Sequence, residues 1–349
     1  DGDEDVSGDG HGTKTLSVIG GFSPGNLVGT AFGAEFLLAR TEDINSETPV
    51  EEDNWIAGLE WAESQGADVV NSSLGYLNWD PGTGESYTWK DLDGNHGKTT
   101  IAADIAVQKG IVIVNSAGNN GPSGLLNTPA DGKWVIAVGA VDASGLLTDF
   151  SSRGPTYDGR IKPDVVAGGA DVISANSDGS DGYREVQGTS FSAPLVAGVC
   201  ALLLQIHPNW TPKEVAEALR RTATDLGSLG PDDLYGWGLV NATAAAKFKP
   251  DMSPSPALAS RVYNCPNPCR GTGTIIYALL PPEREATLQI FAATGLLVRS
   301  FSRFRIDGDK RFISWDGKNQ QGKPVASGVY FCQVRAGDFK AAGKIAVVK

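Results

Sequence analysis

The sequence has few cysteines, few histidines and no long apolar run. These shortages argue against a zinc site and against a transmembrane segment. Its 349 residues include four cysteines and three histidines. No Cys and His residues have the spacing of zinc ligands, which argues against a zinc site. The longest apolar stretches, such as residues 195–206, are too short to cross a bilayer, so we expect no transmembrane segment.

Positive charge is also scarce. Lysine and arginine total 29 against 41 aspartate and glutamate residues, and the net charge is -12. An acidic chain repels nucleic acid and anionic membranes, so neither is an expected partner. No signal peptide is visible. The first residue is Asp1 and the sequence opens within a polar loop, so we expect that the true N-terminus has been lost or removed.

The length suits two domains, and the first shows alternating helix and strand patterns. Continuous Val and Ile runs separated by helices favour an α/β fold, with a mostly parallel sheet covered by helices on both faces. The expected helices are residues 54–65 and 99–109, and the expected strands are residues 67–71, 111–115, 134–141 and 163–167. This pattern occupies residues 1–247.

A proline-rich stretch separates the second domain from the first. Pro250, Pro254 and Pro256 interrupt regular structure, so residues 248–260 are expected to be a linker. After it, short strands alternate with turn signals, which predicts an all-β antiparallel sandwich over residues 261–349. The expected strands are residues 274–279, 287–291, 297–301, 311–315, 328–335 and 344–348.

Three polar motifs of the first domain carry the groups that acyl transfer needs. They are residues 9–13 (DGHGT), 115–121 (NSAGNNG) and 188–194 (GTSFSAP). A serine hydroxyl needs a base within hydrogen-bond reach, and histidine titrates near neutrality. Ser190 follows a Gly-Thr pair and begins a helix, whose free N–H groups favour negative charge. Asn119 follows an apolar strand and two small residues, so its amide can project into a cleft as an oxyanion donor.

In this order, HGT, SAGN and GTSxSAP resemble the motifs of the subtilisin-like serine peptidase family. Further similar segments are residues 70–75 (VNSSLG), 136–140 (IAVGA), 150–155 (FSSRGP), 162–167 (KPDVVA) and 236–241 (GWGLVN). The likeness runs over roughly residues 1–247. It implies a subtilisin-like fold and a secreted serine endopeptidase that acts on polypeptides and requires no cofactor.

The resemblance implies a role for each catalytic residue. His11 would be the general base and acid, Ser190 the nucleophile, and Asn119 would hold the oxyanion together with the backbone N–H of Ser190. Read singly, His11 would be an ordinary loop residue, Ser190 a helix cap and Asn119 a turn residue. The similar sequence on both sides of each residue favours catalysis.

The resemblance also implies substrate-binding residues. Ser73, Leu74 and Gly75 would pair with the substrate backbone as an added strand. Asn127 would line the pocket for the residue that precedes the scissile bond.

The aspartate that completes the family's triad has no counterpart here. It lies in an Asp-x-Gly turn, tens of residues before the histidine, whereas Asp1, Asp3, Asp5 and Asp9 lie close to His11 and do not follow that pattern. We expect the first strand and its aspartate to lie upstream. Without the aspartate the histidine takes the wrong tautomer, at a cost of about 10⁴ in rate. Residues 1–349 alone are therefore expected to be nearly inactive, and the intact protein active.

The second domain resembles a type IX secretion sorting domain. The similar segments are residues 262–268 (VYNCPNP), 288–291 (LQIF), 315–319 (WDGKN), 322–330 (GKPVASGVY) and 344–349 (KIAVVK). The resemblance implies contact with bacterial secretion machinery and a secreted or cell-surface location in a bacterium with an outer membrane. One pair among Cys265, Cys269 and Cys332 could be a disulfide, with Cys269 to Cys332 one open pairing.

Other functions are weighed against the peptidase. A surface-displayed binding module on an inactive peptidase scaffold stays open as the alternative. A lipase or esterase is disfavoured because there is no Gly-x-Ser-x-Gly motif and the histidine precedes the serine. Residues 91–95 resemble part of a calcium loop, and residues 1–9 are acidic. Structural calcium is unsupported, because a plain turn and a solvated loop explain the two segments better.

Overall fold

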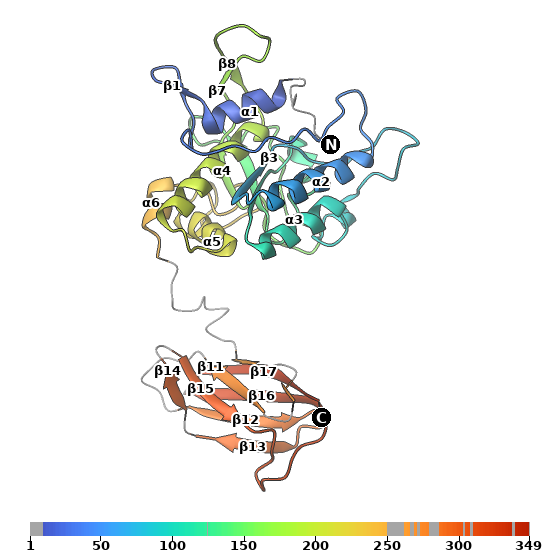
Figure 1. The fold of residues 1–349 in the computed structure, drawn as a ribbon, viewed down its shortest axis with the longest axis vertical. Coiled ribbons are helices and arrows are strands. Elements are labelled where there is room, and N and C mark those ends of the chain that lie inside the picture. Colours follow the sequence, from blue (N-terminus) through green and yellow to red (C-terminus); the bar gives the residue numbers. More distant parts are fainter. Residues whose placement is uncertain are drawn as a thin grey trace. The chain divides into compact units, whose positions relative to one another are not determined.

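The computed structural model describes residues 10–123, 125–249, 262–265, 269–270, 273–278, 286–302, 304–307, 310–336 and 339–348. The chain divides into two units, residues 1–249 and 250–349, and each has its own buried core (Figure 1).

A parallel sheet forms the centre of the first unit, as the Val and Ile runs predict. Its order is β3 (Val69–Ser72), β4 (Val112–Ser116), β5 (Ile136–Val141) and β6 (Val165–Gly168), and each neighbouring pair is parallel. Every residue of β4 and β5 is buried, which requires cover on both faces.

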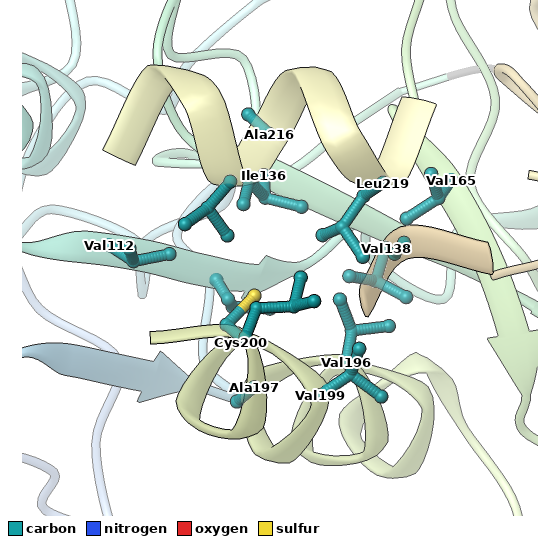
Figure 2. Packing of buried hydrophobic residues seen from close by; sticks show 14 of the residues in the cluster. Val112, Ile136, Val138, Val165, Val196, Ala197, Val199, Cys200, Ala216 and Leu219 are labelled. Carbon is teal, nitrogen blue, oxygen red and sulfur yellow. The ribbon is translucent and has the colours of Figure 1, made fainter. Parts of the chain in front are cut away.

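Helices supply that cover. On one face, Ile113 of β4 packs with apolar residues of α2 (Val50–Ser64) and α3 (Lys98–Lys109). On the other, Val112 and Val114 pack with α4 (Thr189–Ile206), α5 (Pro212–Thr222) and α6 (Ala242–Lys247). Figure 2 shows side chains of α4 and α5 gathered with those of β4, β5 and β6. The expected α/β fold is therefore confirmed for this unit.

α4 confirms the helix start predicted at Ser190 to within one residue. It begins at Thr189, and its 18 residues are apolar enough to cross a membrane by length and composition alone. The helix is thus longer than the apolar run at residues 195–206, whose length was the reason to expect no transmembrane segment. However, 61% of the helix is buried inside the unit, and Ala193, Val196 and Cys200 lie in the core. These contacts are those of a central core helix.

Two short hairpins were not predicted. β1 (Phe22–Ser23) pairs with β2 (Leu27–Val28), and β7 (Val172–Ala175) pairs with β8 (Tyr183–Val186). The first hairpin directly follows α1 (His11–Gly20) in the chain. The second directly precedes α4. Most of β8 is exposed, so it lacks the apolar pattern of a buried strand.

The second unit consists of two sheets around one core. One has the order β10 (Cys269–Arg270), β17 (Phe339–Val348), β16 (Gly328–Ala336), β12 (Thr287–Ala292) and β13 (Leu297–Phe301). The other has the order β14 (Arg305–Asp307), β15 (Lys310–Trp315), β11 (Thr274–Ala278) and β9 (Val262–Cys265). All pairs are antiparallel except β10 with β17, which is parallel and was not predicted.

The cysteines of the described residues are free. Cys200, Cys269 and Cys332 are buried thiols, and Cys200 lies in the core as its apolar surroundings predict. Cys269 lies opposite Val347 of β17, whereas Cys332 lies opposite Gly343. These positions differ by about 13 Å along the strand, beyond the reach of a disulfide. The Cys269–Cys332 bridge is therefore not formed, and the side chain of Cys265 lies outside the described residues.

The first turn of α2 buries two carboxylates. Glu51 and Glu52 are each 1% exposed. Glu52 accepts hydrogen bonds from the Tyr87 hydroxyl at 2.8 and 3.1 Å. Glu51 faces Glu42, and its Oε1 has no hydrogen-bond partner. Burial, together with the negative charges of Glu42 and Glu47, raises the pKa of Glu51 to about 7.

The raised pKa of Glu51 makes a prediction about stability. The folded protein holds this proton more tightly than the unfolded chain, whose pKa is 4.5. The stabilisation is fully present below pH 4.5 and is lost as pH rises through 7. Glu51→Gln cannot ionise, so it should raise Tm by about 5 °C near pH 8.5 and change it little near pH 4.5. Thermal unfolding followed by circular dichroism measures both values. Exposed Glu60→Gln is the control, and equal shifts at both pH values would contradict the explanation.

Candidate active site

His11 and Ser190 lie in the first turns of two helices that pack together. α1 begins at His11 and α4 begins at Thr189. The two helices are in contact and lie side by side in Figure 1. The ring of Phe191 meets the imidazole of His11 near its edge, with 6.1 Å between centroids. The fold therefore brings the predicted base to the residue that follows the predicted nucleophile.

The start of α4 is tied to the end of β3. The Ser190 hydroxyl donates to the carbonyl of Ser73 at 3.2 Å, and the Ser73 hydroxyl donates to the carbonyl of Ser190 at 2.8 Å. Ser190 is half-buried. Its position at a helix N-terminus places it where negative charge is favoured.

Asn119 is oriented by Thr189. Its Oδ1 accepts hydrogen bonds from the Thr189 backbone N–H at 3.0 Å and from the Thr189 hydroxyl at 2.9 Å. Because the amide oxygen is held in this way, the Nδ2 group is left as the donor. Thr189 was not singled out from the sequence, although it lies within the GTS motif.

The Asn119 amide and the Ser190 backbone nitrogen both lie beside Gly188. A Cβ placed on Gly188 would lie 3.6 Å from Asn119 Nδ2, 3.8 Å from Asn119 Oδ1 and 3.8 Å from the backbone nitrogen of Ser190. The φ of Gly188 is +136°, in the region that disfavours side chains, and the glycine keeps this space clear. Two donors around one open position are what a developing oxyanion requires.

Residues 73–75 lie beyond the end of β3 beside Ser190. Among the described residues, no hydrogen bond is donated by the N–H groups of Ser73, Leu74 or Gly75. The next residue, Tyr76, exchanges backbone hydrogen bonds with Thr128 at 2.9 and 3.0 Å, which holds the segment in place. Free N–H groups on an extended segment can bind a further strand.

Asn127 lies beside the end of this segment. Its Nδ2 donates to the carbonyl of Gly75 at 3.3 Å, and its Oδ1 accepts from Asn120 Nδ2 at 2.6 Å. Asn120 also donates to the carbonyl of Leu125 at 2.9 Å. Asn127 is therefore part of a polar network next to residues 73–75, and the sequence did not single out its partner Asn120.

A cavity of about 550 Å³ adjoins the imidazole. Its lining comes from α1, from the start of α4 and from the β7–β8 hairpin with its flanks. The lining residues are His11, Lys14, Asp171, Arg184, Glu185, Val186, Gln187 and Phe191. The site thus has room for a ligand next to the predicted base.

The loop at residues 91–95 is a turn held by its own side chains. The Asp93 carboxylate accepts from the Asn95 backbone N–H at 2.8 Å and lies 2.9 Å from Nδ1 of His96. The pKa of His96 is raised by that hydrogen bond and by the Asp93 charge. No three His, Cys, Asp or Glu side chains in the described ranges are grouped to hold a metal ion. Residues 1–9 lie outside those ranges.

Comparison with known proteins relates this chain to peptidases. The model of the subtilase family matches residues 1–238. Subtilisin from Bacillus pumilus is 35% identical over 246 residues, which cover 69% of this chain and 78% of that protein. Subtilisin E from Bacillus subtilis (strain 168) is 36% identical over 247 residues, or 69% of this chain and 56% of the relative.

Solved structures of proteases are also similar. The Patellamide maturation protease PatA is 30% identical with a TM-score of 0.55, over 68% of this chain and 83% of that one. A lanthipeptide protease is 25% identical with a TM-score of 0.54, over 68% and 75%.

The Thr189 hydroxyl makes a prediction about the site's stability. Besides holding Asn119, it accepts a hydrogen bond from the buried N–H of Gly118 at 3.3 Å. Thr189→Val keeps the shape but leaves that N–H unpaired, which should cost about 1–3 kcal/mol. Thr189→Ser keeps the hydroxyl and should lose less. Urea unfolding midpoints compare the variants, and a wild-type midpoint for Thr189→Val would disprove the anchoring role.

Proposed function

The chain belongs to the subtilase family of serine peptidases, and from that premise we propose that it is the catalytic part of a secreted endopeptidase. The observation that supports the proposal is that Asn119 Nδ2 and the backbone nitrogen of Ser190 both lie beside Gly188, next to the residue that carries the predicted nucleophile. A binding module needs no such pair of donors, whereas acyl transfer does.

In the proposed reaction, Ser190 attacks the carbonyl carbon of a peptide bond. His11 takes the hydroxyl proton and returns it to the leaving amine. The carbonyl oxygen becomes negative in the tetrahedral intermediate, where Asn119 and the Ser190 N–H stabilise it. The amine leaves, and an acyl group remains on Ser190. Water, deprotonated by His11, then attacks the acyl carbon, and His11 returns the proton to the Ser190 oxygen as the acid leaves. No redox or organic cofactor is required.

The substrate is a polypeptide in an extended conformation. The free N–H groups of residues 73–75 support pairing with its backbone, next to the Ser73–Ser190 hydrogen bonds. We assign Asn127 to the pocket for the residue before the scissile bond, because it contacts Gly75 at the end of that segment.

An upstream aspartate completes the proposed triad. The free edge of β3 supports this part of the proposal, because among the described residues β3 pairs with β4 alone. In another part of the first unit, Phe36, Leu37 and Leu38 form an apolar run that is 39%, 46% and 44% exposed. A further strand parallel to β3 would end at the same edge of the sheet as Ser73, and so beside Ser190 and His11.

Labelling with a fluorophosphonate tests this function. In the protein that includes its upstream sequence, Ser190 should react and Ser190→Ala should not. Residues 1–349 alone should cleave a peptide about 10⁴-fold more slowly than the longer form. Mass spectrometry identifies the labelled serine, and a fluorogenic peptide reports the rate.

Two results would count against the proposal. Absence of labelling and cleavage in the longer protein would favour the alternative, a surface-displayed binding module on an inactive scaffold. Full activity of residues 1–349 alone would show that the aspartate is not needed from upstream.

We also assign the second unit to export, as a sorting domain read by bacterial type IX secretion machinery. The similar segments at residues 262–268, 315–319 and 344–349 support this assignment. The two-sheet core around Trp315 and Ile290 gives the unit a structure of its own. It would place the peptidase outside the cell or on the surface of a bacterium with an outer membrane.

Deletion of residues 261–349 tests the export role. The shortened protein should accumulate on the inner side of the host's outer membrane. The full chain should reach the medium or the cell surface. Immunoblots of cell fractions measure the distribution, and active-site labelling shows that the shortened protein is folded. Equal export of both forms would remove the sorting assignment.

A further inference from the structure

A group of carboxylates close to residues 73–75 has no role in the proposed reaction. Glu42, Glu47 and Glu51, called the acidic cluster below, lie around the start of α2. Tyr76 directly follows residues 73–75, and its buried hydroxyl donates to Glu42 Oε1 at 2.7 Å. The same hydroxyl lies 3.5 Å from the backbone carbonyl of Glu51. The acidic cluster is thus joined to the segment that would bind substrate.

The acidic cluster is electrically unbalanced. Within the described part of residues 10–249, no ion pair joins any of its three members to a lysine or arginine. By contrast, Asp53 on the same helix pairs with Lys98 at 3.0 Å. Asp80 brings a further negative charge close to the cluster. Its carboxylate accepts a hydrogen bond from the backbone N–H of Glu47 at 3.0 Å. A positive group is the ligand that this arrangement favours.

Glu51 provides a second and independent sign of a missing partner. Its side chain is 1% exposed, and its Oε1 has no hydrogen-bond partner in the structure. A buried carboxylate oxygen without a donor is costly, and a charged donor would remove that cost. Burial, the negative charges of Glu42 and Glu47, and a hydrogen bond with the Glu42 side chain together raise the pKa of Glu51, and none of them supplies a positive charge.

The acidic cluster extends from the surface to the interior. Glu47 is exposed, Glu42 is half-buried and Glu51 is buried. Because Glu51 is buried, a ligand for it must be a long side chain that carries its charge at the end. A small metal ion fits less well, because no three acidic side chains of the described residues are spaced to hold one.

The distance from Ser190 defines which substrate residue would enter. Ser190 is hydrogen-bonded to Ser73, and Tyr76 lies three residues further along the chain. Three extended residues span about 10 Å. A peptide paired with residues 73–75 and cleaved at Ser190 would bring its third or fourth residue before the scissile bond to this place.

We propose that Glu42, Glu47 and Glu51 form a subsite for a lysine or arginine side chain, three or four residues before the cleaved bond. The inference rests on the proposed peptidase function. A guanidinium or ammonium group would donate to Oε1 of Glu51 and neutralise its neighbours. The enzyme would then select polypeptides with a basic residue upstream of the cleavage site.

Matched fluorogenic peptides test the subsite in the protein that includes its upstream sequence. One pair carries arginine or its neutral isostere citrulline at the third position before the cleaved bond, and a second pair does so at the fourth. The arginine peptide of one pair should have a kcat/KM about tenfold higher or more. Glu51→Gln and Glu47→Gln should each reduce that ratio to about twofold. Glu60→Gln, an exposed change on the same helix, should leave the ratio unchanged.

The outcomes separate the subsite from the peptidase function. Equal cleavage of arginine and citrulline peptides at both positions would overturn the subsite while the peptidase function stands. No cleavage and no labelling of Ser190 would overturn both. Calcium that raises the Tm of the wild type, but not that of Glu51→Gln, would assign the acidic cluster to a metal ion and overturn the subsite. Thermal unfolding of Glu51→Gln shows that a lost preference does not come from misfolding.

Discussion

Burial of α4 against the parallel sheet is the constraint on which the active site depends. The helix packs with β4, β5 and β6 through residues such as Val196 and Cys200 (Figure 2). Because its body cannot move without opening the core, its first turn is held at the carboxyl end of the sheet. Ser190 therefore owes its position to contacts of residues that take no part in chemistry.

The same helix also places His11. A Cβ on Gly198 of α4 would lie 1.9 Å from Oγ1 of Thr30, so only a glycine allows the chain after α1 to approach so closely. Thr30 and Ala31 in turn donate backbone hydrogen bonds to the last turns of α1, at the carbonyls of Val18 and Ile19. The close contact at Gly198 and these hydrogen bonds thus position α1 against α4. At the start of α1, the imidazole lies beside Phe191.

Charge is treated differently in two buried parts of the first unit. Asp164 is fully buried but neutralised by Lys162 and Arg220, and these cations, against the effect of burial, hold its pKa below the usual range. Glu51 is as deeply buried but faces other carboxylates. The first arrangement satisfies its charges within the chain. The second leaves a deficit beside the substrate-binding segment, which is why a basic side chain is the inferred ligand.

Local patterns in the sequence were sufficient for the parallel sheet, for most strand positions of the second unit and for the motifs around His11, Asn119 and Ser190. Buried strands and motif residues leave short-range signals, namely apolar runs and fixed neighbours. They did not reveal the exposed β8 strand or the parallel pairing of β10 with β17, because a polar strand and a two-residue strand carry little periodicity.

Only the folded chain decided which distant groups meet. The hold of Thr189 on Asn119, the exchange of hydrogen bonds between Ser73 and Ser190, and the unpartnered oxygen of Glu51 each depend on elements brought together by burial. The spacing of these residues in the sequence does not predict such contacts. Hydrophobic packing fixes the positions of the helices and strands, and those positions determine which polar groups can form hydrogen bonds.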